Sequence, residues 1–149
     1  MSSSSASDVR VREATLADSD VLAELIALFN GPSVRPERTL ERMTACAGLE
    51  RALLAEVDGL VVGFACVGVV PALADDYPHA SLTELYVRPD WRRRGVGRQL
   101  VKSAEGYAET AAAEHLVLLT GLGNDEAQAF YRALGYDGWA VAMRKRVSP

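Results

Sequence analysis

Residues 82–97 constrain the fold more than any other stretch, because they run from a strand through a short turn into the start of a helix. Pro89 ends the strand, and Gly95 and Gly97 stand where the turn enters the helix. Glycine has no Cβ, so a ligand can approach the backbone closely at these two positions. The first amides of a helix have no partner within the helix, and the helix dipole adds positive character there. Such a helix start is suited to a phosphate or a diphosphate.

Arg92, Arg93 and Arg94 precede this helix start and form a basic island in an acidic chain. The chain has 149 residues, and its 16 lysines and arginines against 20 aspartates and glutamates give a net charge of −4. Because it lacks a broad positive field, we expect no nucleic-acid partner. The island favours an anion at the helix start. The alternative is a tight turn whose arginines are a solvated rim.

The cysteines and the apolar runs exclude further classes of protein. Cys46 and Cys66 are the only two cysteines, and they form no Cys-x-x-Cys pair, so neither a metal site nor a disulfide scaffold is expected. No apolar run has the length of a membrane span, so no membrane partner is expected. Residues 1–7 are serine-rich without the pattern of a secretory signal. We expect a disordered tail over 1–7 and a single cytoplasmic domain over 8–149.

The rest of the chain alternates strand and helix patterns. Strands are expected over 9–13, 51–57, 60–70, 81–87, 116–119 and 141–146, and helices over about 15–30, 36–47, 95–111 and 124–134. Asp58-Gly59 between two apolar runs predicts a hairpin, and Asn30-Gly31-Pro32 predicts a helix end. The order β-α-α-β-β-β-α-β-α-β indicates an α/β (α+β) fold with helices on the faces of a sheet.

Two motifs carry a family resemblance. Residues 92–97, Arg-Arg-Arg-Gly-Val-Gly, fit the signature (Q/R)-x-x-G-x-(G/A). The residues from Asn124 to Tyr136 fit N-x-x-A-x-x-F-Y-x-x-L-G-(F/Y). With both motifs on matching elements, the chain resembles the GNAT superfamily of N-acetyltransferases. The resemblance implies a mixed central sheet of six to seven strands with helices on both faces, and acetyl-CoA as the co-substrate.

The resemblance also assigns residues to acetyl-CoA. The diphosphate would lie on the residues of the first motif, which are Arg92, Arg93, Arg94, Gly95, Val96 and Gly97. The pantetheine arm would pair like an extra strand with Leu85, Tyr86 and Val87. Asn124 would cap its helix and contact acetyl-CoA, with Ala127 in the same motif. For Asn124 the alternative is a cap with no other role.

Two residues are the candidate catalytic groups. Tyr131 matches the family's general acid, a phenol that protonates the departing thiolate. Phe130 beside it is the better candidate for the core. Glu84 is the candidate base, on a strand face that alternation would share with Leu82 and Tyr86. Its alternatives are a group that orients a water molecule and a rim residue paired with an arginine. Members resembling the diamine acetyltransferases carry two acidic residues here, whereas this chain has Thr83 in place of the first.

The leading interpretation is an acetyl-CoA-dependent N-acetyltransferase that acts on a primary amine by direct transfer in a ternary complex. Asp75, Asp76 and Glu84 favour a small cationic or lysine-like acceptor. One alternative is a non-catalytic module that senses acyl-CoA. Another is an acetyltransferase that acts on a protein N-terminus or lysine. The chain is expected to be a monomer or a homodimer.

Overall fold

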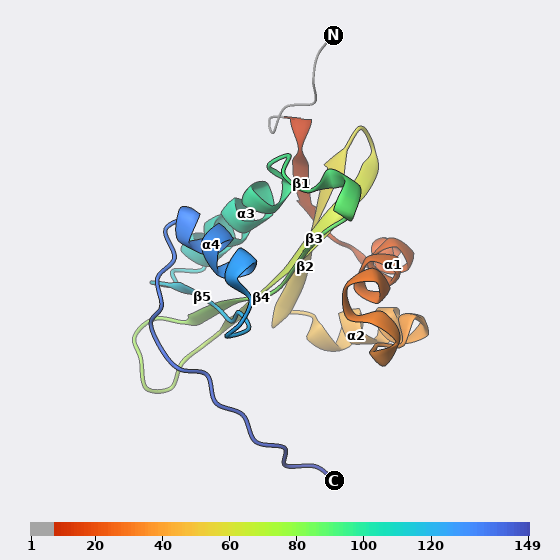
Figure 1. The fold of residues 1–149 in the computed structure, drawn as a ribbon. Helices are drawn as coiled ribbons and strands as arrows, with labels where there is room; N and C mark the ends of the chain where they lie inside the picture. The colour runs from red at the N-terminus through yellow and green to blue at the C-terminus, as the bar shows by residue number, and fades with distance from the viewer. Residues whose placement is uncertain (1–7) are drawn as a thin grey trace. The chain divides into compact units, whose positions relative to one another are not determined.

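Five strands form one mixed sheet, and their order across the sheet is their order along the chain (Figure 1). The strands are β1 (Arg10–Glu13), β2 (Glu50–Val57), β3 (Leu60–Val70), β4 (His79–Val87) and β5 (Leu116–Leu118). The first four pair in antiparallel fashion. The computed structural model describes residues 8–149, so the tail expected over 1–7 lies outside the described residues. Residues up to 117 form one compact unit and residues 118–149 a second, and the expectation of a single domain stays a prediction.

The strand expected over residues 141–146 is wrong, because these residues form no strand in the structure. The sheet therefore has five strands rather than six or seven. Val141 and Met143 are 84% and 92% exposed. Three cations, residues 144–146, follow these two apolar side chains. An apolar face this short offers little to bury against a sheet, which explains the absence of regular pairing.

Four α-helices accompany the strands: α1 (Ser19–Asn30), α2 (Thr39–Cys46), α3 (Val96–Thr110) and α4 (Asp125–Ala133). The Asp18 carboxylate reaches back to the residue before the first helical turn, since the Thr15 amide donates to Asp18 Oδ2 at 2.8 Å. A 3-10 turn over Leu16–Asp18 separates Thr15 from α1. The helix expected from Pro36 also begins as a 3-10 turn, Pro36–Arg38. α1 ends at the predicted glycine, Gly31, which has a φ of 66°.

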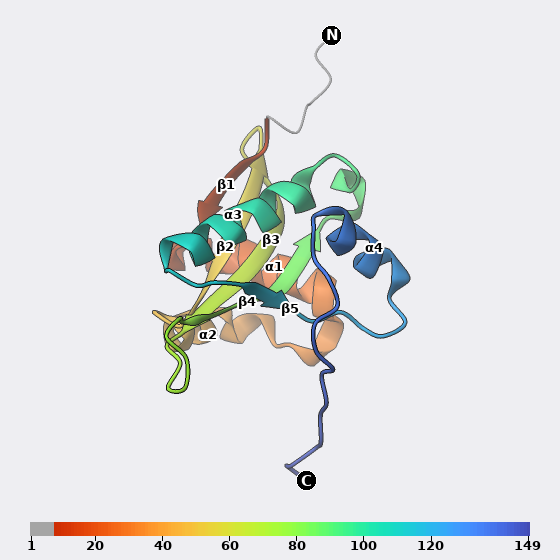
Figure 2. The same cartoon turned by 90° about the vertical axis from the view of Figure 1, so that its left-hand side faces the viewer.

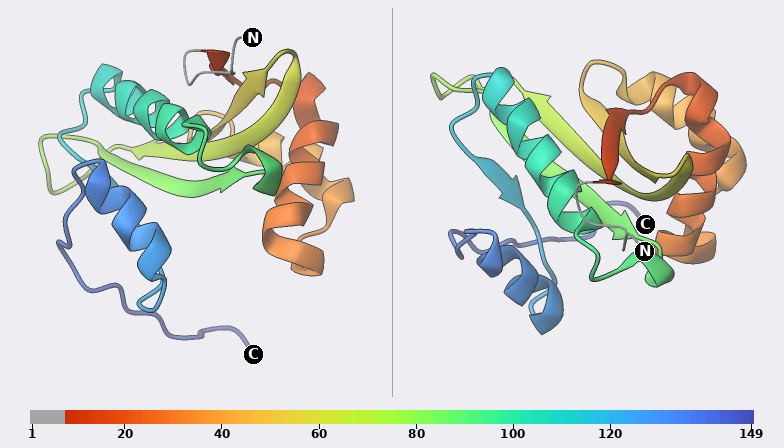
Figure 3. Two further views of the ribbon diagram at one scale, coloured as in Figure 1. Left: turned by 45° about the horizontal axis from the view of Figure 1, so that its top comes forward. Right: turned by 90° about the horizontal axis from the view of Figure 1, so that it is seen from above.

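Helices cover both faces of the sheet within the larger unit, with α1 and α2 on one face and α3 on the other (Figures 2 and 3). On the first face, the buried side chains of Leu22 and Leu25 join a cluster with Leu54, Phe64 and Tyr86. α3 buries the apolar stripe formed by Val96, Leu100, Val101, Ala104 and Ala108. Two layers of helix around one sheet thus confirm the α/β class expected from the sequence.

The pairing of β3 with β4 shifts by one residue at Thr83. Cys66 lies opposite Glu84, but the next residue of β3, Val67, lies opposite Leu82. Thr83 is therefore an extra residue, which reverses the alternation of side chains on β4. Glu84 and Tyr86 share the face covered by α1, as expected. The expectation that Leu82 shares this face is wrong, because the bulge turns it to the opposite side.

Turn residues fix the remaining boundaries. Val57 and Leu60 pair around Asp58-Gly59, whose φ angles of 52° and 80° are both left-handed, as the hairpin prediction requires. In the second unit, Asn124 Oδ1 accepts from the Ala127 amide at 3.1 Å and caps α4. Gly135, at φ 97°, follows the end of that helix, which the sequence predicts over 124–134. Among the helices of residues 8–149, none combines the length and apolar character needed to cross a bilayer.

Candidate active site

The start of α3 leaves a row of backbone amides without partners inside the helix. Gly95 is the N-cap, with a left-handed φ of 82°, and it offers no side chain to cap the helix. The amides of Val96, Gly97 and Arg98 therefore have no intrahelical acceptor. Arg93 is also left-handed, with a φ of 61°. Left-handed residues directly before a helix occur in backbone arrangements that bind anions.

Two of the three arginines in the basic island also hold this loop in place. Arg92 Nε donates to the carbonyl oxygen of Val87 at 3.0 Å, and its guanidinium lies 5.6 Å from the centre of the Tyr86 ring. Arg94 lies 4.9 Å from the centre of the Trp91 ring. Arg92 therefore ties the loop to the end of β4, so the interpretation of all three arginines as a solvated rim is wrong for it.

Arg93 differs from its neighbours. Its side chain is exposed, and no hydrogen bond, ion pair or ring contact within residues 8–149 involves it. A non-glycine residue in the left-handed region costs about 1 kcal/mol. The chain thus keeps a cation at a strained position where it has no contact within the described structure. Its positive charge is available to a ligand beside the free amides of α3.

The end of β4 packs closely against its neighbours. Tyr86 is buried, and its ring centre lies 5.4 Å from that of Phe29 and 6.4 Å from that of Phe64. A Cβ on Gly63 of β3 would lie 2.7 Å from the Tyr86 carbonyl oxygen and 3.4 Å from Leu100. Glycine at this position lets α3 and the end of β4 approach each other. Leu85, Tyr86 and Val87 are thereby fixed directly before the loop that carries the arginines.

Glu84 is a half-buried carboxylate without a cationic partner among the described residues. None of the ion pairs formed within residues 8–149 involves it. Burial raises the pKa of Glu84 above its usual range, and the negative charge of Glu50 raises it further. The expected alternative of a rim residue paired with an arginine is therefore wrong. A carboxylate that is partly desolvated and unpaired is a candidate for proton transfer.

Glu50 is the site residue that the sequence did not reveal. It begins β2, and its Oε1 accepts a hydrogen bond from the Thr83 hydroxyl of β4. A single charged residue at the start of a strand belongs to no sequence motif that would mark it as functional. The pairing that brings it near Glu84 depends on strand register, which spans residues far apart in the chain.

The second unit holds the other predicted residues. Asn124 and Ala127 form the N-terminal cap of α4, so the structural role expected for Asn124 is present. The Tyr131 ring contacts Phe130 and Tyr136 edge to face, with centroids 5.1 Å and 5.8 Å away. Phe130 is half-buried rather than part of a fully buried core. Burial raises the pKa of Tyr131 above its ordinary value, so its phenol stays protonated at neutral pH.

The loop over residues 71–78 carries the two aspartates expected to favour a cationic acceptor. Asp75 Oδ2 lies 3.4 Å from His79 Nε2, and Asp75 Oδ1 accepts from the Tyr77 amide at 3.2 Å. These contacts lower the pKa of Asp75, with the Tyr77 amide as the larger cause. Asp76 is exposed. The Asp75 carboxylate thus already has partners in Tyr77 and His79, so it is a weaker candidate for contact with a cationic acceptor.

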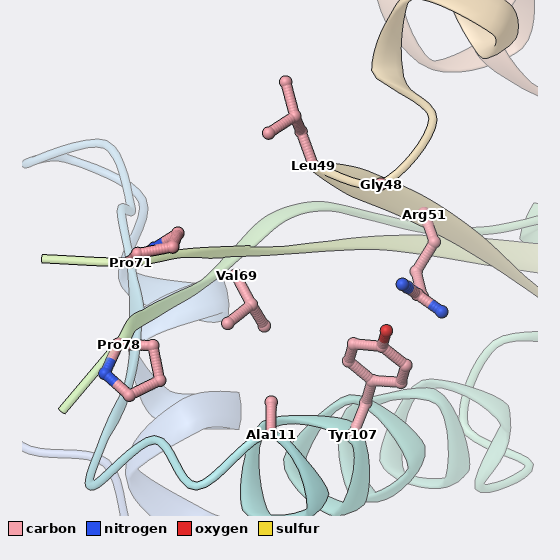
Figure 4. Close-up of a pocket in the computed structure, with 8 residues that line it drawn as sticks. All are labelled: Gly48, Leu49, Arg51, Val69, Pro71, Pro78, Tyr107 and Ala111. Atoms are coloured by element: carbon pink, nitrogen blue, oxygen red, sulfur yellow. The ribbon is translucent and has the colours of Figure 1, made fainter.

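A hollow of about 360 Å³ lies elsewhere in the larger unit, between the start of β2, the end of β3 and α3 (Figure 4). It is lined by Gly48, Leu49, Arg51, Val69, Pro71, Pro78, Tyr107 and Ala111. The Arg51 guanidinium stacks 3.9 Å above the Tyr107 ring and pairs with Glu13 at 3.3 Å. None of the predicted site residues lines this hollow, and its one cation already has partners.

Comparison with known sequences decides the family. The sequence profile of the Acetyltransferase (GNAT) family matches residues 20–136 of this chain. The chain belongs to the GNAT acetyltransferase family. The expected enzyme class, an N-acetyltransferase, is confirmed by this match. Both motifs noted in the sequence lie inside the matched region.

Individual GNAT relatives support the same assignment. The chain is 30% identical to an aminoglycoside N(6')-acetyltransferase type 1 of Stenotrophomonas maltophilia over 139 residues, which cover 89% of this chain and 88% of that protein. It is 34% identical over 99 residues to an uncharacterised N-acetyltransferase of Methanocaldococcus jannaschii; the match covers 62% of this chain and only 43% of that protein. These named relatives do not point specifically to diamine acetyltransferases.

A solved GNAT structure shares the fold. The structure of an aminoglycoside N-acetyltransferase in complex with CoA superposes with a TM-score of 0.83 at 20% sequence identity, over 93% of each chain. The similarity extends beyond the two motifs to nearly the whole chain. It supports the GNAT-like arrangement of strands and helices that the sequence predicted.

Proposed function

We propose that this GNAT protein transfers the acetyl group of acetyl-CoA to a primary amine of a small cationic acceptor. One arrangement carries the proposal: the uncapped, arginine-rich start of α3 follows directly on the strand that carries the unpaired Glu84. The first part suits a diphosphate and the second suits an amine. A catalyst of acetyl transfer from CoA needs both.

The residues have separate roles in this proposal. The amides of residues 96–98 and the Arg93 guanidinium bind the diphosphate, and Arg92 keeps their loop against the end of β4. Leu85, Tyr86 and Val87 lie beside the pantetheine arm. Asn124 and Ala127 contact acetyl-CoA from the start of α4.

The proposed reaction is a direct transfer with balanced proton movements. The neutral amine attacks the thioester carbonyl carbon, the new C–N bond forms, and the C–S bond breaks. Glu84 accepts the proton that leaves the amine nitrogen, directly or through one water molecule. Tyr131 donates its phenolic proton to the departing sulfur, so that CoA leaves as a thiol. No covalent intermediate with the enzyme is required, and Cys46 and Cys66 have no part in the step.

Aminoglycosides are the acceptor class proposed first, because the named relative of Stenotrophomonas maltophilia is an aminoglycoside acetyltransferase and spans nearly all of this chain. Their several ammonium groups suit a site with carboxylates and an acidic chain. Diamines are a second acceptor class, since Glu84 matches one of the two acidic positions of that subgroup.

A panel of amines tests the proposal. The protein is incubated with acetyl-CoA and, in turn, an aminoglycoside, a polyamine and a lysine-containing peptide, and both free CoA and N-acetylated product are measured. The expected result is one acetylated amine for each CoA released, with the aminoglycoside or the polyamine preferred. Tight binding of acetyl-CoA without turnover of any amine would contradict the proposal and favour a sensor of acyl-CoA.

A further inference from the structure

Glu50, at the start of β2, lies on the same face of the sheet as Glu84. Glu50 pairs in register with Gly68 of β3, and Cys66, two residues earlier on β3, pairs with Glu84 of β4. Positions two residues apart on a strand share a face, so Glu50 and Glu84 lie diagonally across β3. This is the face that α1 covers and that holds Phe64 and Tyr86.

Glu50 lies across β3 beside Gly68. A Cβ built on Gly68 would lie 3.9 Å from the Cβ and 4.0 Å from the Cγ of Glu50. The same Cβ would lie 3.3 Å from the Leu49 carbonyl oxygen, which is a tight contact. The stem of Glu50 therefore lies at van der Waals distance from the Gly68 position, and its carboxylate reaches Thr83 of β4.

Thr83 holds that carboxylate at β4. Its hydroxyl donates to Glu50 Oε1 and also lies 3.3 Å from the Cys66 carbonyl oxygen. The β-bulge places Thr83 where it makes this bond directly before Glu84. Thr83 stands at the position where the diamine subgroup has its first acidic residue. In this chain the Thr83 hydroxyl instead binds the carboxylate of Glu50 from β2.

Among residues 8–149, neither Glu50 nor Glu84 forms an ion pair with a cation. The titratable groups gathered here are the two carboxylates, the Cys66 thiol of β3 and the Cys46 thiol at the end of α2, whose sulfur lies 4.0 Å from Glu50 Oε2. Burial raises the pKa of Cys66, so its thiol stays neutral. A like charge close to a carboxylate favours its protonated form.

We propose that Glu50 is a positioning residue for acetyl transfer: held by Thr83 across Gly68, its negative charge makes Glu84 a stronger acceptor for the proton of the attacking amine. The inference rests on the proposed function, since it gives Glu84 the role of base. Glu50 itself acts through Glu84. It supplies from β2 the second carboxylate that the sequence of β4 lacks.

Replacing Glu50 with Gln tests the inference, because Gln keeps the shape and can still accept from Thr83 but removes the charge. Two readouts are compared with the parent protein: the titration of the Glu84 carboxyl carbon by NMR, and the dependence of kcat/KM on pH. We expect the Glu84 midpoint and the acid limb of the profile to move together to lower pH. Thr83→Val keeps the charge and releases its anchor, and should give a smaller shift in the same direction.

Glu56→Gln is the matched control, since Glu56 lies on the same strand but pairs with Arg12. It should leave the Glu84 midpoint unchanged. An unchanged or raised Glu84 midpoint in Glu50→Gln overturns the inference, as does an acid limb that stays in place while the midpoint falls. Failure of the proposed function is a separate result, absence of acetyl transfer in the parent protein, on which the NMR titration does not depend.

Discussion

Arg92 donates a hydrogen bond from Nε to the carbonyl oxygen of Val87 at 3.0 Å, and this bond joins the two halves of the proposed acetyl-CoA site. Val87 ends the strand that carries Glu84, and Arg92 begins the loop that leads to the free amides of α3. The arginine thus has a structural role in addition to its charge. Arg93, the next residue, makes no contact within residues 8–149, so it would act on CoA through its charge alone.

Arg92→Met is expected to reduce both folding stability and CoA affinity. It removes the bond to Val87 and the contact with the Tyr86 ring, which together should cost about 1–2 kcal/mol of unfolding free energy. Thermal denaturation measures the first effect and calorimetric titration with CoA the second. A variant with the stability of the parent would show that the bond to Val87 does not hold the loop.

Arg93→Asn is expected to weaken CoA binding without loss of stability, since Asn tolerates the left-handed backbone and Arg93 has no internal contact. The loss should be up to about 1 kcal/mol, roughly fivefold in affinity, at low salt. The difference from the parent should shrink as salt is added, because an exposed charge is screened. If the variant and the parent bound CoA with equal affinity at low salt, Arg93 would be an exposed residue with no part in CoA binding.

Gly63→Ala is expected to destabilise the protein by about 2 kcal/mol, because its Cβ would meet the Tyr86 carbonyl oxygen at 2.7 Å. It should also weaken acetyl-CoA binding, since the end of β4 must shift. Gly106→Ala is the matched control: Gly106 lies within α3 with nothing within 4 Å of the new Cβ. This control should gain up to about 1 kcal/mol. Urea denaturation measures the change in unfolding free energy of each variant. Similar stabilities of the two variants would contradict the close approach at Gly63.

Tyr131→Phe is expected to lower kcat by a factor on the order of 10² or more and to leave the Kd for acetyl-CoA unchanged. Because burial raises the pKa of Tyr131, the phenol is protonated across neutral pH, and any loss of activity that comes from its ionisation should lie above the ordinary titration range of tyrosine. Steady-state kinetics and a binding titration separate the two effects. A kcat equal to that of the parent would exclude Tyr131 as the general acid.

Asp18→Asn is expected to reduce stability most at neutral pH, and the loss should become smaller as the pH falls below about 4. Asp18 accepts from Arg12 at 2.8 Å and from the Thr15 amide, and these bonds lower its pKa. A lowered folded-state pKa gives stability that is complete above the unfolded pKa of about 4 and is lost as the pH falls toward the folded value. Losing the cap and the ion pair should cost about 1–2 kcal/mol at pH 7.

Denaturation of the parent and of Asp18→Asn at pH 7 and at pH 3 measures this difference. The two stabilities should approach each other at the lower pH. A difference that stays constant with pH would show that the Asp18 carboxylate contributes by shape rather than by charge.

Local signals predicted the elements that depend on neighbouring residues. The Asp58-Gly59 hairpin, the Asn124 cap and the Gly135 helix end each follow from a few residues with a fixed backbone preference. The start of α3 was predictable for the same reason, since Gly95 and the preceding arginines lie together in the chain.

Nonlocal features were not predictable from local patterns. The bulge at Thr83 depends on how β3 and β4 pair, and it moved Leu82 to the other face. Glu50 acquires its place through the register of β2, β3 and β4 and the hydrogen bond from Thr83. The strand expected over residues 141–146 is wrong because an alternating pattern of side chains does not by itself supply a partner strand.

The most direct test of the account follows the backbone amides of Val96, Gly97 and Arg98 by NMR during titrations with CoA and with pantetheine, which lacks the diphosphate and the nucleotide. We predict that CoA moves these three signals in a saturable way and that pantetheine leaves them in place. Signals that stay fixed while CoA binds, or that pantetheine moves equally, would contradict the central claim that the start of α3 binds the CoA diphosphate.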